Sequence, residues 1–410
     1  MYRHYSNHKT LSTVIFLDNV GLSLYGAIFG VYLYDLNATF TELAMLSAVP
    51  SLVMLFLSRY WGIVSDETHV RKPYVIWSKF LRPFFVLTYG LVQEPKTIII
   101  IFVLATILTS PGAPAFNAII TTIGRKEHRG SSIGQIVSIA ALGNTIGGFC
   151  SAILIKIMPV KTLFVYSFII LLCSALLFTV GYQEEKSKNY LNMNLLKKAF
   201  GKAYSAREFS ADRELFPLIF SMLVYNIGVT AFFHVFFIKL YLAINRDKSL
   251  YAFISSLSSA VSIFAPIIYG RIADHVGFKK LLTIAIYSRA LYMIVLAIVW
   301  DPLTLMILWV VPIWAAIRVS SMGLATLILG DEKAARAQGT FAVSNQIASI
   351  IAPILSGILA DYLGVRENMS NATPIYMLGI ILCFISAIIV LIKVKEDKHN
   401  LSLSIYKEQI

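Results

Sequence analysis

The stretch GRIADHVGFKK at residues 270–280 is a short polar segment between two long apolar runs. A related stretch, GIVSDETHVRK at residues 62–72, lies 208 residues earlier and is flanked in the same way. Both place a glycine four residues before an aspartate and end on two adjacent basic residues. Short charged loops between apolar runs of about 20 residues are typical of chains that cross a membrane repeatedly as helices. The two stretches therefore predict a polytopic membrane protein with an internal repeat.

The composition supports a membrane protein over the whole length of the chain. Hydrophobic residues make up 57% of the 410 residues, charged residues only 14%, and the mean hydropathy is +0.73. Soluble domains carry about 25% charged residues, so a soluble fold is excluded. Alternating ten-residue strands are absent, which favours helices over a barrel. The net charge of +13 lies in short loops and forms no continuous basic face, so we expect no nucleic-acid partner.

We predict an all-α polytopic membrane protein with twelve transmembrane helices in two pseudo-symmetric bundles of six. The expected spans are 12–34, 40–64, 73–93, 97–123, 132–157, 160–182, 216–243, 250–272, 279–300, 303–329, 337–361 and 373–394. The expected parts are an N-terminal bundle at 1–182, a cytoplasmic linker at 183–214, a C-terminal bundle at 215–396 and a cytoplasmic tail at 397–410.

The distribution of Lys and Arg predicts the orientation. About twenty lie in the termini, the linker and the loops on their side, against about seven in the other loops. The positive-inside rule therefore predicts a multi-pass protein of the cell membrane with both termini in the cytoplasm.

The repeat extends beyond the two loops. The run Asn19 to Ser23 returns as Asn226 to Thr230, 207 residues later, and small residues recur at similar spacing in the spans 132–157 and 337–361. Six spans per half give both halves the same orientation, related by an axis along the membrane normal. Such halves enclose a central site and rock about it.

The two loops resemble the signature that the major facilitator superfamily of transporters carries between its second and third helices. That signature reads Gly, three residues, Asp, two residues, Gly, Arg, then Arg or Lys. The matching residues are Gly270, Asp274, Gly277, Lys279 and Lys280 in the second half and Gly62, Asp66, Arg71 and Lys72 in the first. The first copy departs from the signature at His69 and Val70. The resemblance implies alternating-access transport, with these loops latching the outward-facing state; topogenic charge alone is the other interpretation.

A second resemblance concerns helix packing. The residues are Gly143, Gly147 and Gly148 in the span 132–157 and Ala352 and Pro353 in the span 337–361. They resemble the Gly-Pro motif of the family's antiporters, but Gly148 stands where proline is expected. Small residues at this spacing also allow plain close packing. Symport and antiport therefore both stay open.

Ionisable and polar groups inside the spans are the candidates for function, because burying charge in a membrane is costly. The candidate substrate-binding or coupling residues are Asp18, Asn19, Asn117, Asn226, His234 and Arg318. Asp18 either couples protons or pairs with Arg59, which lies at a similar depth. Arg318 lies near the middle of its span, and the resemblance implies that the first, fourth, seventh and tenth spans line the cavity. It is thus a candidate for binding an anionic group, with a helix-end carbonyl or Asp18 as the alternative partner.

The remaining polar candidates have two interpretations each. Asn226 and His234 share one face of the span 216–243, while Asn117 lies in a span that Pro111 and Pro114 are expected to bend. These groups either bind a polar solute or form interhelical hydrogen bonds. Three further cations lie in spans that the family places at the periphery, and we expect them to snorkel to the headgroups. They are Lys79, Arg82 and Arg289.

We predict a secondary transporter and no enzyme, because no phosphate loop, metalloprotease motif or catalytic triad context is present. No catalytic residue, cofactor or metal is expected, and the three cysteines predict no disulfide framework. The expected partners are a small organic solute, protons or another coupling ion, and the lipid bilayer, and we expect a monomer. The cargo is expected to be anionic or neutral and polar. The alternatives are a proton-driven multidrug efflux antiporter and, more distantly, a non-transporting sensor or a channel.

Overall fold

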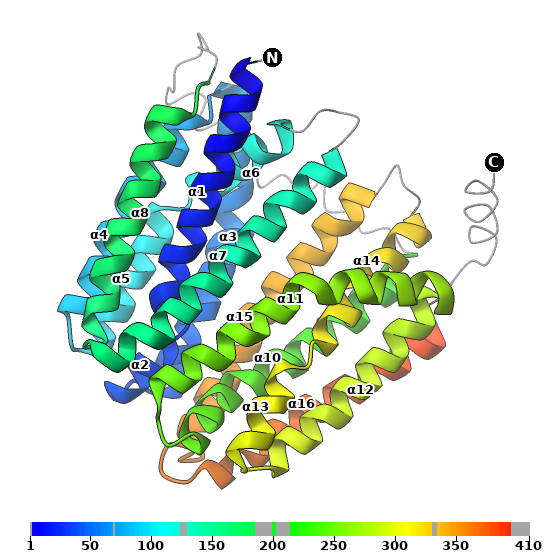
Figure 1. Cartoon of the computed structure of the whole chain (residues 1–410). Helices are drawn as coiled ribbons and strands as arrows, with labels where there is room; N and C mark the ends of the chain where they lie inside the picture. Colours follow the sequence, from blue (N-terminus) through cyan, green and yellow to red (C-terminus); the bar gives the residue numbers. More distant parts are fainter. Residues whose placement is uncertain are drawn as a thin grey trace. The chain divides into compact units, whose positions relative to one another are not determined.

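The computed structural model describes residues 2–68, 70–123, 129–184, 199–201, 214–329 and 334–394, and these ranges are almost entirely helical (Figure 1). Most of the predicted linker at 183–214 and all of the predicted tail at 397–410 lie outside the described residues. Eleven of the twelve predicted spans correspond to a helix or a pair of helices within four residues of their expected ends, whereas the first begins ten residues earlier than expected, at Tyr2.

The helices of the first half are α1 (Tyr2–Gly26), α2 (Phe29–Asp35), α3 (Phe40–Thr68), α4 (Lys72–Leu91), α5 (Pro95–Leu108), α6 (Gly112–Ile123), α7 (Arg129–Ile157) and α8 (Lys161–Gly181). Those of the second half are α10 (Phe216–Ala243), α11 (Lys248–Val276), α12 (Phe278–Ile298), α13 (Pro302–Val310), α14 (Ile313–Leu329), α15 (Ala334–Tyr362), the short 3₁₀ helix η4 (Met369–Ala372) and α16 (Thr373–Lys393).

Ten helical segments in the described ranges are long and apolar enough to cross a membrane, and the bent pair α5 and α6 makes an eleventh. The helix outside this set is α4, which is 20 residues long and carries Lys79 and Arg82 in its interior. At 1.5 Å per residue its length matches the hydrocarbon core. Counting α4 gives the twelve spans that the sequence predicts, and the all-α polytopic fold is confirmed.

Three of the spans are broken. The bend between α5 and α6 is 50° and lies beside Pro111, as predicted, because proline lacks the N–H of an intrahelical hydrogen bond. The break between α13 and α14 at Val311 and Pro312 has the same cause and was not predicted. The first span is also two helices, which separate at Ala27 and Ile28.

Contacts divide the chain into two compact units. The first comprises Met1–Glu208 with Leu240–Ile263, and the second comprises Phe209–Lys239 with Phe264–Ile410. Helices α10 and α11 therefore each contribute residues to both units. The predicted bundle boundaries at 182 and 215 stay a prediction.

Glycines set the close approach of α7 to α1 in the first unit. A Cβ at Gly143 would lie 2.8 Å from the backbone oxygen of Phe16, and one at Gly147 would lie 2.5 Å from that of Val20. Neither position has room for a side chain, so α7 rests directly on the backbone of α1. This contact fixes the face of α1 that carries Asn19.

A glycine contact also joins α10 and α16 in the second unit. A Cβ at Gly228 would lie 2.7 Å from the oxygen of Gly379, and a Cβ at Gly379 equally close to the oxygen of Gly228. Gly228 lies 207 residues after Gly21, which meets Leu171 of α8 in the first unit. The two units therefore repeat the same close contact between equivalent helices.

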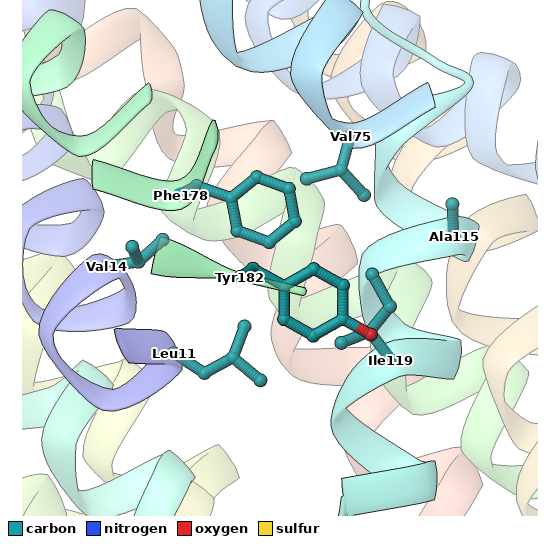
Figure 2. Close-up of a cluster of buried hydrophobic side chains, with 7 residues drawn as sticks. All are labelled: Leu11, Val14, Val75, Ala115, Ile119, Phe178 and Tyr182. Atoms are coloured by element: carbon teal, nitrogen blue, oxygen red, sulfur yellow. The ribbon is translucent and has the colours of Figure 1, made fainter. Parts of the chain in front are cut away.

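A buried apolar cluster, drawn in Figure 2, lies between four helices of the first unit. It joins the middle of α1 and the beginning of α4 to α6 and to the end of α8. Its members are Leu11, Val14, Val75, Ala115, Ile119, Phe178 and Tyr182. Burial of this apolar surface holds four helices of the first unit together.

Candidate functional site

The polar centre of the first unit is an ion pair between Asp18 of α1 and Lys79 of α4. The Lys79 Nζ donates to Asp18 Oδ2, and the side chains of Lys79 and Asp18 are only 10% and 17% exposed. Ser174 of α8 donates its hydroxyl to Asp18 Oδ1 over 2.6 Å. Three helices thus meet at one carboxylate, and both of its oxygens are satisfied.

This geometry corrects two expectations. Asp18 pairs with Lys79 and not with Arg59, and Lys79 does not snorkel to the headgroups. Rings of Phe116 and Phe178 lie 4.8 and 5.8 Å from the Lys79 ammonium and add cation–π attraction. Lys79 was recognisable in the sequence as a cation in the middle of an apolar run. It was not made a candidate because its helix was expected to lie at the periphery.

The other predicted polar residues of the first unit have separate environments. Asn19 donates to the Ile15 carbonyl of its own helix over 2.7 Å, which satisfies its amide locally. Asn117 is exposed on α6. The hydroxyl of Ser110, next to the bend, is buried and has no partner in the described ranges. Neither Asn19 nor Asn117 joins the polar centre at Asp18.

In the second unit, Asn226 of α10 donates to the Asn345 side chain of α15 over 2.6 Å. His234, two turns further along α10, is half-buried. The structure thus adds Asn345, an exposed residue on α15, to the predicted stripe of α10. An amide pair joining two helices matches the interhelical interpretation and also offers donors and acceptors to a polar solute.

Arg318 is an exposed side chain in the interior of α14. Its side chain makes no ion pair or hydrogen bond with any residue of its own unit that the structure describes, so no helix-end carbonyl of that unit is its partner. The opposite face of α14 is buried through Ala316, Ser320 and Leu324. The guanidinium therefore faces away from the interior of its own unit.

Two further buried cations lie in the second unit. Lys239 of α10 is fully buried and donates to the carbonyls of Leu296 and Ala297, 2.8 and 2.6 Å away at the end of α12. Arg289 of α12 is 7% exposed and does not snorkel, which corrects the expectation for it. Lys239 was not among the predicted functional residues, although a lysine near the end of an apolar run is a recognisable signal.

The first signature loop is ordered by charge. Arg71 donates to Asp66 over 3.3 Å. Glu184, just after α8, accepts the backbone N–H groups of Arg71 and Lys72 over 2.8 and 2.9 Å. Its carboxylate thus caps the first turn of α4, where the helix dipole favours negative charge. Glu184 was missed, although an acidic residue directly after an apolar run is a recognisable signal.

The second signature loop lacks this arrangement. Asp274 is exposed and forms no ion pair within the described ranges. Gly277 has a φ of 91°, which favours glycine, and begins the turn into α12. Gly270 has open space where a Cβ would stand, as does Gly62 in the first loop. The shared sequence pattern therefore carries two different sets of contacts.

Asp35 at the end of α2 holds a third set of polar contacts, within the first unit. Its Oδ2 accepts the Tyr241 hydroxyl over 2.7 Å and forms an ion pair with Lys248 at the start of α11. Both ion-pair side chains are about one quarter exposed. These residues belong to opposite halves of the sequence, which is why no pattern within one half predicted the contact.

The predicted residues thus fall into separate groups. Asp18, Asn19 and Asn117 belong to the first unit and Asn226, His234 and Arg318 to the second. The packing residues are also divided, with Gly143, Gly147 and Gly148 in the first unit and the buried Ala352 and Pro353 in the second. A Cβ at Gly148 would lie 2.1 Å from the Ser256 hydroxyl of α11.

Comparison with known proteins covers nearly the whole chain. A family model described as Major Facilitator Superfamily matches residues 11–326 and 218–409. An uncharacterised MFS-type transporter of Methanocaldococcus jannaschii is 22% identical over 374 residues, which are 89% of this chain and 94% of that protein.

Solved structures share the fold. A variant of the nucleoside transporter NupG matches with a TM-score of 0.75 and 14% identity over 95% of this chain and 100% of that chain. A bacterial homologue of the human lysosomal transporter Spinster, in an inward-facing and occupied conformation, matches with a TM-score of 0.75 and 12% identity over 97% and 98%. The predictions of a multi-pass membrane protein and of a transporter that is no enzyme are confirmed, and the chain belongs to the Major Facilitator Superfamily.

Proposed function

We propose that this secondary transporter carries a small organic solute, anionic or neutral and polar, by alternating access and uses a proton gradient to do so. The observation that carries the proposal is the exposed Arg318 on α14, which has no partner among the described residues. Asp18, by contrast, is neutralised by Lys79 inside its own unit. The charge left to act on a solute is therefore positive.

The position of Arg318 supports an aqueous environment for its guanidinium. An Arg in the interior of a membrane span costs at least about 2.5 to 3.5 kcal/mol when it faces lipid. Such residues therefore face water-filled cavities or a partner. The planar fork of a guanidinium is suited to two oxygens of a carboxylate or phosphate.

We propose proton coupling because two side chains inside the spans can gain or lose a proton. Protonation of Asp18 would break its pair with Lys79, and His234 of α10 changes charge near neutral pH when unperturbed. The two candidates differ in their surroundings, because Asp18 lies in a closed network whereas His234 is half-buried. Asp18→Asn and His234→Gln test them separately through the response of uptake to an imposed pH gradient.

The orientation and assembly are part of the same proposal. The excess of Lys and Arg on one side supports both termini in the cytoplasm of a cell that carries the protein in its cell membrane. Glu184 accepts the backbone N–H groups of Arg71 and Lys72, which gives the first loop a polar anchor on that same side. We propose a monomer as the functional form.

A thermal-shift screen of the purified protein tests the solute class. The panel contains organic anions, sugars and nucleosides, and lipophilic cations, each at several concentrations. We expect an organic anion or a polar neutral solute to raise the unfolding temperature, with a loss of the shift in Arg318→Ala and partial retention in Arg318→Lys. Stabilisation by lipophilic cations alone, unchanged in Arg318→Ala, would instead favour the multidrug antiporter.

A further inference from the structure

In the described parts of the spans, three cations are buried or nearly buried, and two of them have oxygen acceptors. Lys79 has the carboxylate of Asp18. Lys239 has two carbonyls at the carboxyl end of α12, where the helix dipole is negative. Each of these ammonium groups is therefore compensated by the protein itself.

Arg289 is the third and differs from the other two. It is 7% exposed, and no hydrogen bond or ion pair joins its side chain to any residue in the described ranges. Its Nε is fully buried without an acceptor. A guanidinium carries five N–H donors, so all five lack an oxygen here.

Aromatic rings form the surroundings of this guanidinium. Its carbon Cζ lies 4.4 Å from the ring centre of Phe233 on α10 and 5.1 Å from that of Tyr292 on its own helix. Cation–π attraction stabilises such a group by about 0.5 to 2 kcal/mol. That is less than the several kcal/mol that desolvation of a charge costs, so the rings alone leave it undercompensated.

The second half has no acidic residue at the position equivalent to Asp18. Adding the 207-residue repeat to Asp18 gives Tyr225, a buried phenol on α10. The same addition to Arg82 of α4 gives Arg289. The second unit therefore keeps the arginine of the first, but it has Tyr225 in place of Asp18 and Ile286 in place of Lys79.

We propose that Arg289 binds a small monovalent carboxylate anion inside the second unit. The residue is 7% exposed, and its Nε is fully buried without an acceptor in the described structure. A planar fork with free in-plane donors fits a planar pair of oxygens. The site lies on α12, is separate from Arg318 on α14, and is independent of the identity of the transported solute.

Thermal unfolding of the purified full chain in the presence of sodium formate tests the site, with sodium chloride at equal ionic strength as reference. We expect a saturable rise in unfolding temperature for the unmodified protein. The rise is lost in Arg289→Gln and needs about tenfold more formate in Arg289→Lys, because an ammonium cannot bind both oxygens in the fork geometry.

Two matched variants separate this site from others. Arg82→Gln changes the equivalent arginine of the first half, and Arg318→Ala removes the cation of the proposed solute site; both keep the formate effect. An equal rise in Arg289→Gln, equal affinity in Arg289→Lys, no saturable rise in the unmodified protein, or an equal saturable rise with chloride would overturn the proposal. If Arg289→Gln does not fold, the comparison with Arg289→Lys decides. Loss of the effect in Arg318→Ala alone would assign formate binding to the other site.

Discussion

The two units place cations in equivalent helices, α4 and α12, but compensate them differently. In the first unit Lys79 meets Asp18 and Ser174, and every oxygen and the ammonium are engaged. In the second unit Arg289 lies among rings without an oxygen. The repeat thus preserves the helices and their glycine contacts, whereas the polar interior has diverged into one closed network and one open site.

The largest expected effect is the loss of the closed network. Lys79→Met leaves the largely buried Asp18 without its cation, and removing one partner of a buried ion pair costs about 3 to 5 kcal/mol. We therefore expect the free energy of unfolding to fall by that amount in a denaturant titration of the purified protein. The double variant Asp18→Leu with Lys79→Met recovers most of the loss, because no charge is left uncompensated. A loss below about 1 kcal/mol for Lys79→Met would contradict the network.

The opposite result is expected at Arg289. Arg289→Met removes a cation that has no acceptor in the described structure, so in the absence of ligand the free energy of unfolding stays equal or rises by about 1 to 4 kcal/mol. The same denaturant titration measures it, in buffer without carboxylate anions. A loss as large as that of Lys79→Met would show that Arg289 has a protein partner and would remove the contrast between the units.

A smaller effect is expected at Asp35. The pair of Asp35 with Lys248 is about one quarter exposed, so water screens it. A double-mutant cycle of Asp35→Asn and Lys248→Gln is expected to give a coupling energy of about 1 kcal/mol. Tyr241→Phe serves as a control that removes the hydrogen bond alone. A coupling energy of zero would show that the two side chains lie close together without stabilising the fold.

The smallest effects on stability are expected in the two signature loops. Asp66 is 68% exposed, so loss of its pair with Arg71 costs less than about 0.5 kcal/mol. If the loops latch a transport state, Asp274→Asn lowers uptake in vesicles by more than about fivefold, which corresponds to about 1 kcal/mol. Protein level and unfolding temperature serve as controls for both variants. Unchanged uptake with normal protein level would leave the loop with a topogenic role only.

The sequence predicts the helices well because their length and apolarity are local properties. The bend at Pro111 is also predictable locally, because proline interrupts a helix. The same rule could have predicted the break at Pro312. Side-chain partners could not be predicted in this way. Helices α1 and α8 are apolar on most of their circumference, so periodicity does not show which neighbouring helix a polar residue contacts. The Asp18 pair with Lys79 depends on the rotation of two helices that are 61 residues apart in the chain.

The candidate site was predictable in part for the same reason. Arg318 and Asn226 stand out as polar residues in apolar runs, and the structure gives Asn226 a partner that lies 119 residues away. Arg289 and Lys79 stand out equally, but a peripheral position was assumed for their helices. A charged residue in a span requires an account of its partner wherever its helix lies.

Accumulation of a radiolabelled organic anion in proteoliposomes tests the central claim most directly. The anion is the one that gives the largest thermal shift, and the vesicles carry an imposed pH gradient. We expect gradient-dependent accumulation above the external concentration, abolished by collapse of the gradient and strongly reduced in Arg318→Ala. Equilibration without accumulation, or uptake unaffected by Arg318→Ala, would contradict the proposal of a proton-coupled carrier that binds its solute through Arg318.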